Sequence, residues 1–261
     1  MSRRFALIVA ALVTTTSVVL AACNSAPAAP LLTDPKEILT ETVVALKDLK
    51  TVEITGSFSG KIEAAELGGS LDLSTVTMNA AVDVPNKKAK FTLDAPSLFG
   101  TKIDALVVDD AAYYKVAGLL GGMLGGTADK YTKTEIPESS GAPMNDPAEI
   151  AKAVDEMKTE LDKLPKPPTR GADEKCGDQD CYHVTIALTA EDLQSLDPTG
   201  GSMAQAGDFT FDLWTRHNDR LPAKLMLSVA SPDIGTIGMT LEFRYGASIS
   251  VDAPPADQIA P

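Results

Sequence analysis

The sequence is poor in the residues on which catalysis and metal binding usually depend. Only two of its 261 residues are histidines, three are cysteines, and aromatic residues make up 5%. There is no G-x-S-x-G motif around a nucleophilic serine and no Walker loop, and the glycine-rich residues 118–126 lack the lysine and serine that bind phosphate. His183 falls within an expected strand and His217 at an expected turn. We therefore expect no enzyme activity, no cofactor and no metal site, and an extracellular hydrolase has no residues to support it.

Basic residues are also scarce. The chain has 23 Lys and Arg against 36 Asp and Glu, a formal net charge of −13. An excess of acidic residues repels nucleic acid and the anionic headgroups of a membrane surface. We expect neither as an electrostatic partner.

Long apolar runs are absent beyond the N-terminus, and the one found there has the pattern of a signal peptide. A positive start, Arg3-Arg4, precedes the mostly apolar residues 5–20, which end in small residues. A transmembrane helix needs about 20 apolar residues with anchoring flanks, and this stretch is shorter. We predict that residues 1–22 are a signal peptide.

The end of that segment, Leu20-Ala21-Ala22-Cys23, has the order of the lipobox of bacterial lipoproteins. There the cysteine thiol is acylated and the chain is cut just before it. We expect Cys23 to carry lipid (palmitate-type acyl chains) and to hold the protein on the extracytoplasmic side of the cell membrane. An ordinary secretory signal is the alternative. Removal of residues 1–22 leaves 21 basic against 36 acidic residues.

The two remaining cysteines, Cys176 and Cys181, are separated by four residues. An exported protein meets an oxidising compartment, so a disulfide is the default, and this spacing suits a bridge across a tight hairpin. A zinc site that uses both thiols and His183 is the less favoured alternative.

Two segments combine a helix-start pattern with helical spacing of apolar residues. Asp34-Pro35-Lys36-Glu37 places Asp at the N-cap and Pro at the first helical position, and Asp146-Pro147-Ala148-Glu149 repeats the pattern. The apolar stripes that follow are Ile38, Leu39, Thr42, Val43, Leu46 and Leu49, and Ile150, Val154, Met157, Leu161 and Leu164. We predict two amphipathic helices, and a short third one after Thr189.

Elsewhere apolar and polar residues alternate with a period of two, as in antiparallel strands with one solvated face. The predicted strands are 52–62, 70–84, 89–94, 102–108, 112–116, 169–176, 181–188, 209–213, 221–229 and 237–245, with Ile249 and Val251 closing the series. The apolar residues of 70–84 change face midway, so we expect a bulge near Ser74.

This order of elements predicts an α+β fold with one long antiparallel sheet and helices on one face. The expected division is a signal peptide (1–22), a flexible tether (23–33), a single domain (34–253) and a loose C-terminal tail (254–261). The sheet face is rich in aliphatic side chains and poor in aromatic ones, which suits acyl chains better than hydrogen-bonding ligands. Periodicity alone does not distinguish an open cavity from a filled core. An envelope sensor or scaffold with a filled core, acting through a protein partner, therefore stays open.

The chain resembles the LppX/LprAFG lipoprotein family of actinobacterial envelopes, whose fold is similar to that of LolA-type carriers, over about residues 34–254. The segments that carry the resemblance are Leu20-Ala21-Ala22-Cys23, 45–51, 52–60, 109–114, 211–214, 221–225, 243–246 and 249–255. It implies a strongly curved half-barrel with helices across its concave side, enclosing a hydrophobic cavity for acylated lipid or glycolipid. It also implies that residues 116–126 form a lip near the cavity mouth.

The resemblance implies a membrane-anchored, non-catalytic carrier of lipid. We expect it to be monomeric, with an envelope transporter as a further partner. The side chains expected to line the cavity are Val52, Ile54, Phe58, Ile103, Val107, Ile150, Val154, Met157, Leu161, Phe211, Leu213, Leu225, Leu227, Met239, Leu241 and Phe243.

Overall fold

The computed structural model describes residues 30–64, 69–109, 111–119, 121, 129–135, 147–196, 207–231 and 235–260. The expected signal peptide, Cys23, most of the tether and most of segment 116–126 lie outside these residues. Leu32–Pro261 forms one compact unit. None of the described helices is both long and apolar enough to cross a bilayer.

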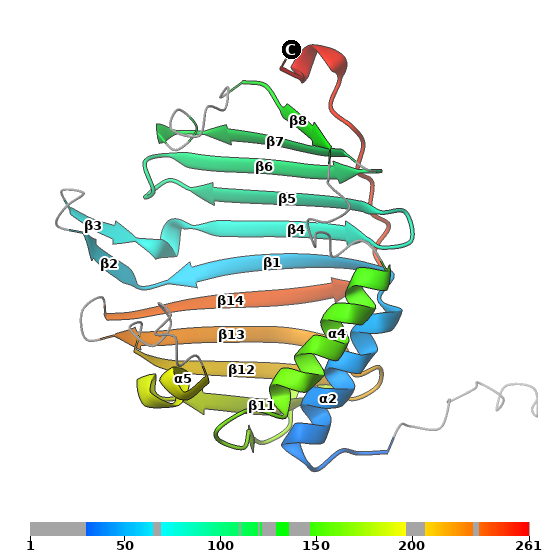
Figure 1. Ribbon diagram of the computed structural model, residues 1–261, viewed down its shortest axis with the longest axis vertical. Helices are drawn as coiled ribbons and strands as arrows, with labels where there is room; N and C mark the ends of the chain where they lie inside the picture. Colours follow the sequence, from blue (N-terminus) through cyan, green and yellow to red (C-terminus); the bar gives the residue numbers. More distant parts are fainter. Residues whose placement is uncertain are drawn as a thin grey trace, which may run out of the picture. The chain divides into compact units, whose positions relative to one another are not determined.

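A large antiparallel sheet dominates this unit (Figure 1). Its strands are β1 (Thr51–Ser59), β4 (Thr77–Asp83), β5 (Lys88–Ala95), β6 (Thr101–Val108), β7 (Ala111–Ala117), β8 (Thr132–Glu135), β9 (Thr169–Arg170), β10 (Glu174–Cys176), β11 (Gln179–Leu188), β12 (Asp208–Arg216), β13 (Pro222–Ser231) and β14 (Gly235–Tyr245). They pair in the order β10-β11-β12-β13-β14-β1-β4-β5-β6-β7-β8, and β9 also pairs with β11. The single long antiparallel sheet predicted from the sequence is confirmed. The strongly curved half-barrel is not: the sheet is not strongly curled.

The register of the strands gathers apolar side chains on one face of the sheet. Residues directly opposite each other in neighbouring strands share a face. Ile54 lies opposite Phe243 and Ala80, and Leu225 lies opposite Leu213 and Leu241. By the same rule, the apolar face extends to Ile103 of β6 and Val116 of β7. The other face carries mainly polar residues, such as Glu53 and its partner Arg244.

Two helices lie side by side across one part of the sheet (Figure 1). They are α2 (Pro35–Ala45), continued by the short η2 (Leu46–Asp48), and α4 (Pro147–Leu161); a third helix, α5 (Ala190–Leu196), follows β11. The N-cap predicted at Asp34 is present, since its carboxylate accepts a hydrogen bond from the Lys36 backbone N–H at 2.8 Å. The N-cap expected at Asp146 falls outside the described residues.

Apolar clusters connect this helix pair to the sheet at both of its ends. Near the start of α2, the fully buried Ile38 packs with Tyr182 and Val184 of β11, and Leu161 of α4 contacts the same cluster. Beyond η2, Leu49 packs with Val52 and Val82, together with Ile150 from the start of α4. The two helices therefore span the sheet between two separate contacts.

The chain leaves the main sheet after β1. Gly60 adopts φ +99, and a Cβ there would lie 2.3 Å from the Thr236 carbonyl oxygen, so glycine is required. β2 (Lys61–Ala64) then pairs only with β3 (Gly69–Asp72) in a separate two-stranded sheet. The bulge expected near Ser74 is instead a 3-10 turn, η4 (Leu73–Thr75), which Asp72 caps.

The C-terminal segment differs from the expectation in two ways. Ile249 and Val251 are not in a strand: Val251 is buried against Leu106 and Tyr113, on the sheet face opposite the helices. The segment after Pro254 is attached, in contrast to the loose tail expected. It contains η5 (Ala256–Gln258), and the backbone of Tyr131 hydrogen-bonds to both Gln258 and Ala260 at 2.8 Å.

The expected disulfide joins Cys176 and Cys181, whose Cα atoms are 5.9 Å apart. Cys176 ends β10, and the turn at Gly177 leads directly into β11, so the bridge closes the β10–β11 hairpin. Because both sulfur atoms are in this bond, they cannot serve as thiolate ligands in the zinc site considered above.

Replacing both cysteines by serine should lower the free energy of unfolding by about 2 kcal/mol, the loop-closure entropy of so short a ring. β11 also pairs with β12 over eight residue pairs, so the sheet should persist. Chemical denaturation followed by the fluorescence of Trp214, the single tryptophan, measures the loss. An unchanged stability would show that the bridge contributes nothing to folding.

Candidate ligand-binding site

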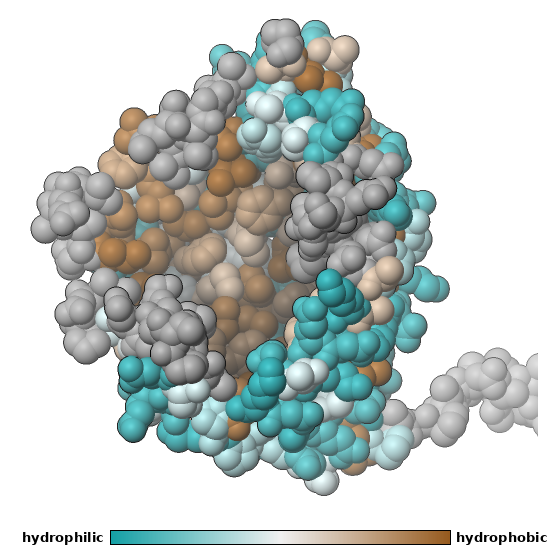
Figure 2. Space-filling model, viewed as in Figure 1, coloured by the Kyte–Doolittle hydropathy of each residue, from teal (hydrophilic) through white to brown (hydrophobic). Residues whose placement is uncertain are grey.

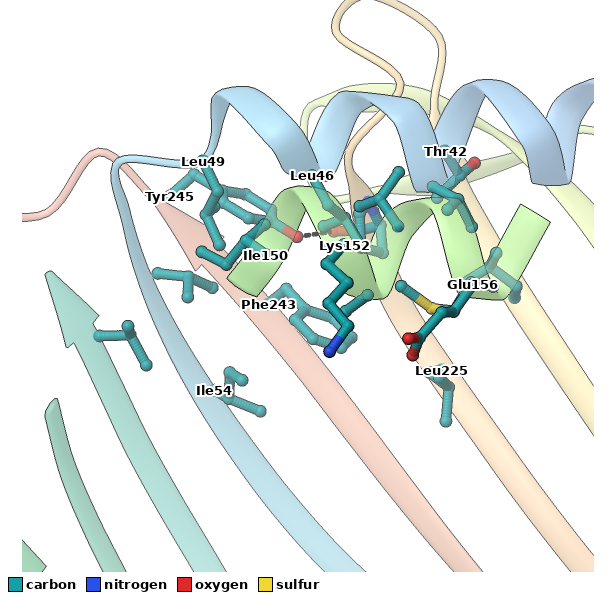
Figure 3. A pocket seen from close by; sticks show the side chains of 18 of the residues that line it. Thr42, Leu46, Leu49, Ile54, Ile150, Lys152, Glu156, Leu225, Phe243 and Tyr245 are labelled. Carbon is teal, nitrogen blue, oxygen red and sulfur yellow. Dashed lines mark hydrogen bonds between the residues drawn. The ribbon is translucent and has the colours of Figure 1, made fainter. Parts of the chain in front are cut away.

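A pocket of about 550 Å³ lies between the helix pair and the apolar face of the sheet (Figure 3). The helices provide its roof and β1, β4, β12, β13 and β14 its floor. Its lining residues are Thr42, Val43, Leu46, Leu49, Val52, Ile54, Val82, Ile150, Lys152, Ala153, Val154, Glu156, Met157, Phe211, Leu213, Pro222, Leu225, Phe243 and Tyr245. This volume is within the range of about 300–1,000 Å³ that is usual for ligand pockets.

Nine of the sixteen side chains expected to line a cavity are among them. These are Val52, Ile54, Ile150, Val154, Met157, Phe211, Leu213, Leu225 and Phe243. The other seven, which do not line the pocket, are Phe58, Ile103, Val107, Leu161, Leu227, Met239 and Leu241. Six of the seven lie on the same apolar sheet face, farther along the strands or on strands that the helices do not cover. Leu161 instead packs against the cluster at the start of α2.

The roof residues of α2, of η2 and of the position directly after η2 were not predicted as cavity residues. Thr42, Val43, Leu46 and Leu49 belong to the apolar stripe that identified the helix. The apolar stripe identifies the face of the helix that turns toward the sheet. It does not show which residues of that face pack against other side chains and which line a pocket. Tyr245 and Pro222, at the ends of their strands, were also missed.

The polar groups in the inner wall are hydrogen-bonded within the protein. The Tyr245 hydroxyl donates to the Pro222 carbonyl oxygen at 2.7 Å, the dashed line in Figure 3. Burial raises the pKa of Tyr245, so the hydroxyl keeps the proton that it donates. The Thr42 hydroxyl lies 2.7 Å from both the Ile38 carbonyl oxygen and the Thr215 hydroxyl. The inner wall is thus left with apolar surface for a ligand.

The space-filling view shows the same face as hollowed, with hydrophobic residues at the bottom of the hollow and hydrophilic residues along α4 (Figure 2). Two charged side chains of α4, Lys152 and Glu156, line the pocket and are exposed to solvent. The pocket therefore combines an apolar interior with charge only where it meets water.

The two histidines lie outside the pocket. His183 of β11 is stacked on Trp214, with ring centroids 4.3 Å apart, and its Nε2 lies 2.9 Å from an Asp212 carboxylate oxygen. Thr185 donates a hydrogen bond to the same carboxylate at 2.6 Å. His217 is stacked on Tyr182 at 3.9 Å. In the described part of the chain, no three His, Cys, Asp or Glu residues form a group that could hold a metal ion.

Comparisons with known proteins find likeness in structure only. No protein-family model matches the sequence, and no curated protein sequence does. The Mycobacterium tuberculosis lipoprotein LppX is similar at 13% identity and a TM-score of 0.48, covering 84% of this chain and 98% of its own. LprF from Mycobacterium bovis is similar at 15% identity and a TM-score of 0.46, covering 84% of this chain and 96% of its own.

A third similar structure is the Pseudomonas aeruginosa MucA/MucB complex, at 12% identity and a TM-score of 0.39, covering 87% of this chain and 60% of that one. At these identities the likeness concerns the arrangement of the chain and not a ligand. The structural similarity is to the LppX and LprF lipoproteins and to MucB, without a match at the level of sequence.

An open pocket predicts that a larger side chain in its floor is tolerated. Leu225→Trp should change the free energy of unfolding by less than about 1 kcal/mol, because the indole can enter the empty volume. Val184→Trp is the matched control: Val184 is fully buried in the neighbouring cluster, and overpacking there should cost about 3 kcal/mol. Denaturation followed by far-ultraviolet circular dichroism compares them. Equal losses for both variants would mean that Leu225 faces packed protein.

Proposed function

We propose that this protein is a membrane-anchored lipoprotein that binds and carries an acylated lipid or glycolipid in the pocket, without catalysis. The observation that supports this most directly is an apolar pocket of about 550 Å³ whose inner polar groups are already hydrogen-bonded. A ligand that enters it gains affinity from area removed from water and not from hydrogen bonds. The choice of an acylated ligand also follows the family resemblance of the sequence.

The size of the pocket supports one alkyl chain as its occupant. A methylene group occupies about as much space as a water molecule in the liquid, roughly 30 Å³, so the pocket has room for about 18 such groups. Burial contributes about 0.8 kcal/mol per methylene. A palmitoyl chain could therefore provide on the order of 10 kcal/mol before the costs of ordering and association.

The alternative of a sensor or scaffold with a filled core predicts that the helix and sheet side chains meet across the middle. The pocket argues for the carrier and against this alternative, because Ile150 and Met157 of α4 line the same open space as Ile54 and Phe243 of the sheet. A carrier must also lie near a membrane, and the lipid anchor proposed at Cys23 would hold it there.

Native mass spectrometry of the full-length protein, gently released from membranes, tests the proposal. We expect one bound acylated lipid per chain, recovered by organic extraction, and a lower occupancy in Leu225→Trp because the indole takes up part of the pocket. Ser248→Ala, an exposed position outside the pocket, is the control and should retain the lipid. A wild-type protein that carries no lipid and takes up none from added vesicles would overturn the proposal.

The anchor has its own test. Growth with an alkyne analogue of palmitate should label the wild-type protein, and Cys23→Ser should lose the label and move from the membrane fraction to the soluble fraction. Cys176 and Cys181 are internal controls because both are already in a disulfide. Retention of the label in Cys23→Ser would place the lipid on another residue, and absence of the label from the wild-type protein would show that the signal is an ordinary secretory one.

A further inference from the structure

Two charged residues stand at the edge of an otherwise apolar site. Lys152 and Glu156, both on α4, line the pocket, and Figure 3 shows the two side chains extending from the same side of the helix. Residues four apart on a helix lie on one face, about 6 Å apart along the axis. A bound lipid would therefore meet one positive and one negative group.

These two groups have no charged partner within the described part of the chain. The side chain of neither Lys152 nor Glu156 forms an ion pair or hydrogen bond with another described residue, and the two side chains do not pair with each other. Two neighbouring carboxylates, that of Asp155 in α4 and that of Asp162 directly after it, are occupied. Asp155 is 2.8 Å from the Lys47 ammonium, and Asp162 is 2.8 Å from that of Lys36. The Lys47 and Lys36 ammonium groups hold the pKa values of Asp155 and Asp162 below the usual range. Lys152 and Glu156 thus remain available to a ligand.

The charge of the whole chain bears on which headgroup these residues accept. With a formal net charge of −13, the protein repels a ligand of net negative charge, and Glu156 adds to this repulsion at the site itself. A headgroup with both a phosphate and an ammonium carries no net charge and offers a partner to each residue.

We propose that Lys152 and Glu156 select a zwitterionic phospholipid headgroup, with Lys152 at the phosphate and Glu156 at the ammonium, while the acyl chain fills the pocket. This inference rests on the proposed function, since the headgroup is placed at the edge by the chain that occupies the interior. Apolar area provides the affinity, and the charged pair provides the choice among lipids of equal chain length.

Three probes with chains of similar length separate the two contributions. They are palmitoyl lysophosphatidylethanolamine, hexadecyl phosphate and hexadecanol, and the binding of each to the full-length protein is measured by its displacement of a fluorescent fatty-acid analogue at concentrations at which the probe is monomeric. Lys152→Gln should weaken binding of both phosphate-containing probes by about two- to fivefold, the scale of an exposed ion pair. Glu156→Gln should weaken the lysophosphatidylethanolamine by a similar factor and leave hexadecyl phosphate equal or stronger. Hexadecanol should bind both variants as it binds the wild type.

Lys158→Gln and Glu160→Gln serve as matched controls, because both residues are on α4 and neither lines the pocket. They should leave the binding of all three probes unchanged. If hexadecanol binds and neither Lys152→Gln nor Glu156→Gln affects the lysophosphatidylethanolamine, headgroup selection is wrong and the lipid pocket stands. If the wild-type protein binds none of the three probes, the proposed function itself fails.

Discussion

The pocket depends on the way in which the helix pair is held at both of its ends. At one end Ile38 packs into the cluster of Tyr182 and Val184, and at the other Leu49 and Ile150 pack with Val52. Between these contacts, side chains of the helices and of the sheet line one open space. A helix fixed only at one end could settle onto the sheet and fill this space, so the two clusters together maintain the opening.

The second constraint is the satisfaction of polar groups. Thr42 and Tyr245 could offer hydrogen bonds to a ligand, but each is engaged within the protein. Buried polar groups without partners would disfavour an alkyl chain, because they would lose water and gain nothing. The pocket therefore favours ligands that bind by burying apolar surface. In the proposal above, Lys152 and Glu156 at its edge distinguish between headgroups.

Much of the fold follows from local patterns in the sequence. The alternation in residues 237–245 predicts β14 and its apolar face, the Asp34-Pro35 pair predicts the start of α2, and the cysteine spacing predicts the β10–β11 hairpin. These features depend on residues close together in the chain. The turn at Ser74 was predicted as a bulge because a change of face is compatible with either structure, and only pairing with β2 decides between them.

The candidate site was predicted less completely, for a physical reason. Alternation establishes which face a side chain occupies but not how far the helices extend across it. Ile103 and Ile54 share a face, yet only Ile54 lies beneath the helix pair and lines the pocket. Val251 shows the same limit on the opposite face: its apolar character was read as a strand, whereas it packs on the sheet as part of an irregular segment.

The central claim is that an alkyl chain occupies the space beneath α2 and α4. A crystal structure of the protein with a brominated fatty acid tests this most directly, because bromine gives an anomalous signal that locates the chain. The account predicts a peak between α4 and β14, within contact distance of Ile54, Phe243 and Leu225. Bromine found only on the outer surface, with those side chains in contact with Ile150 and Met157, would contradict it.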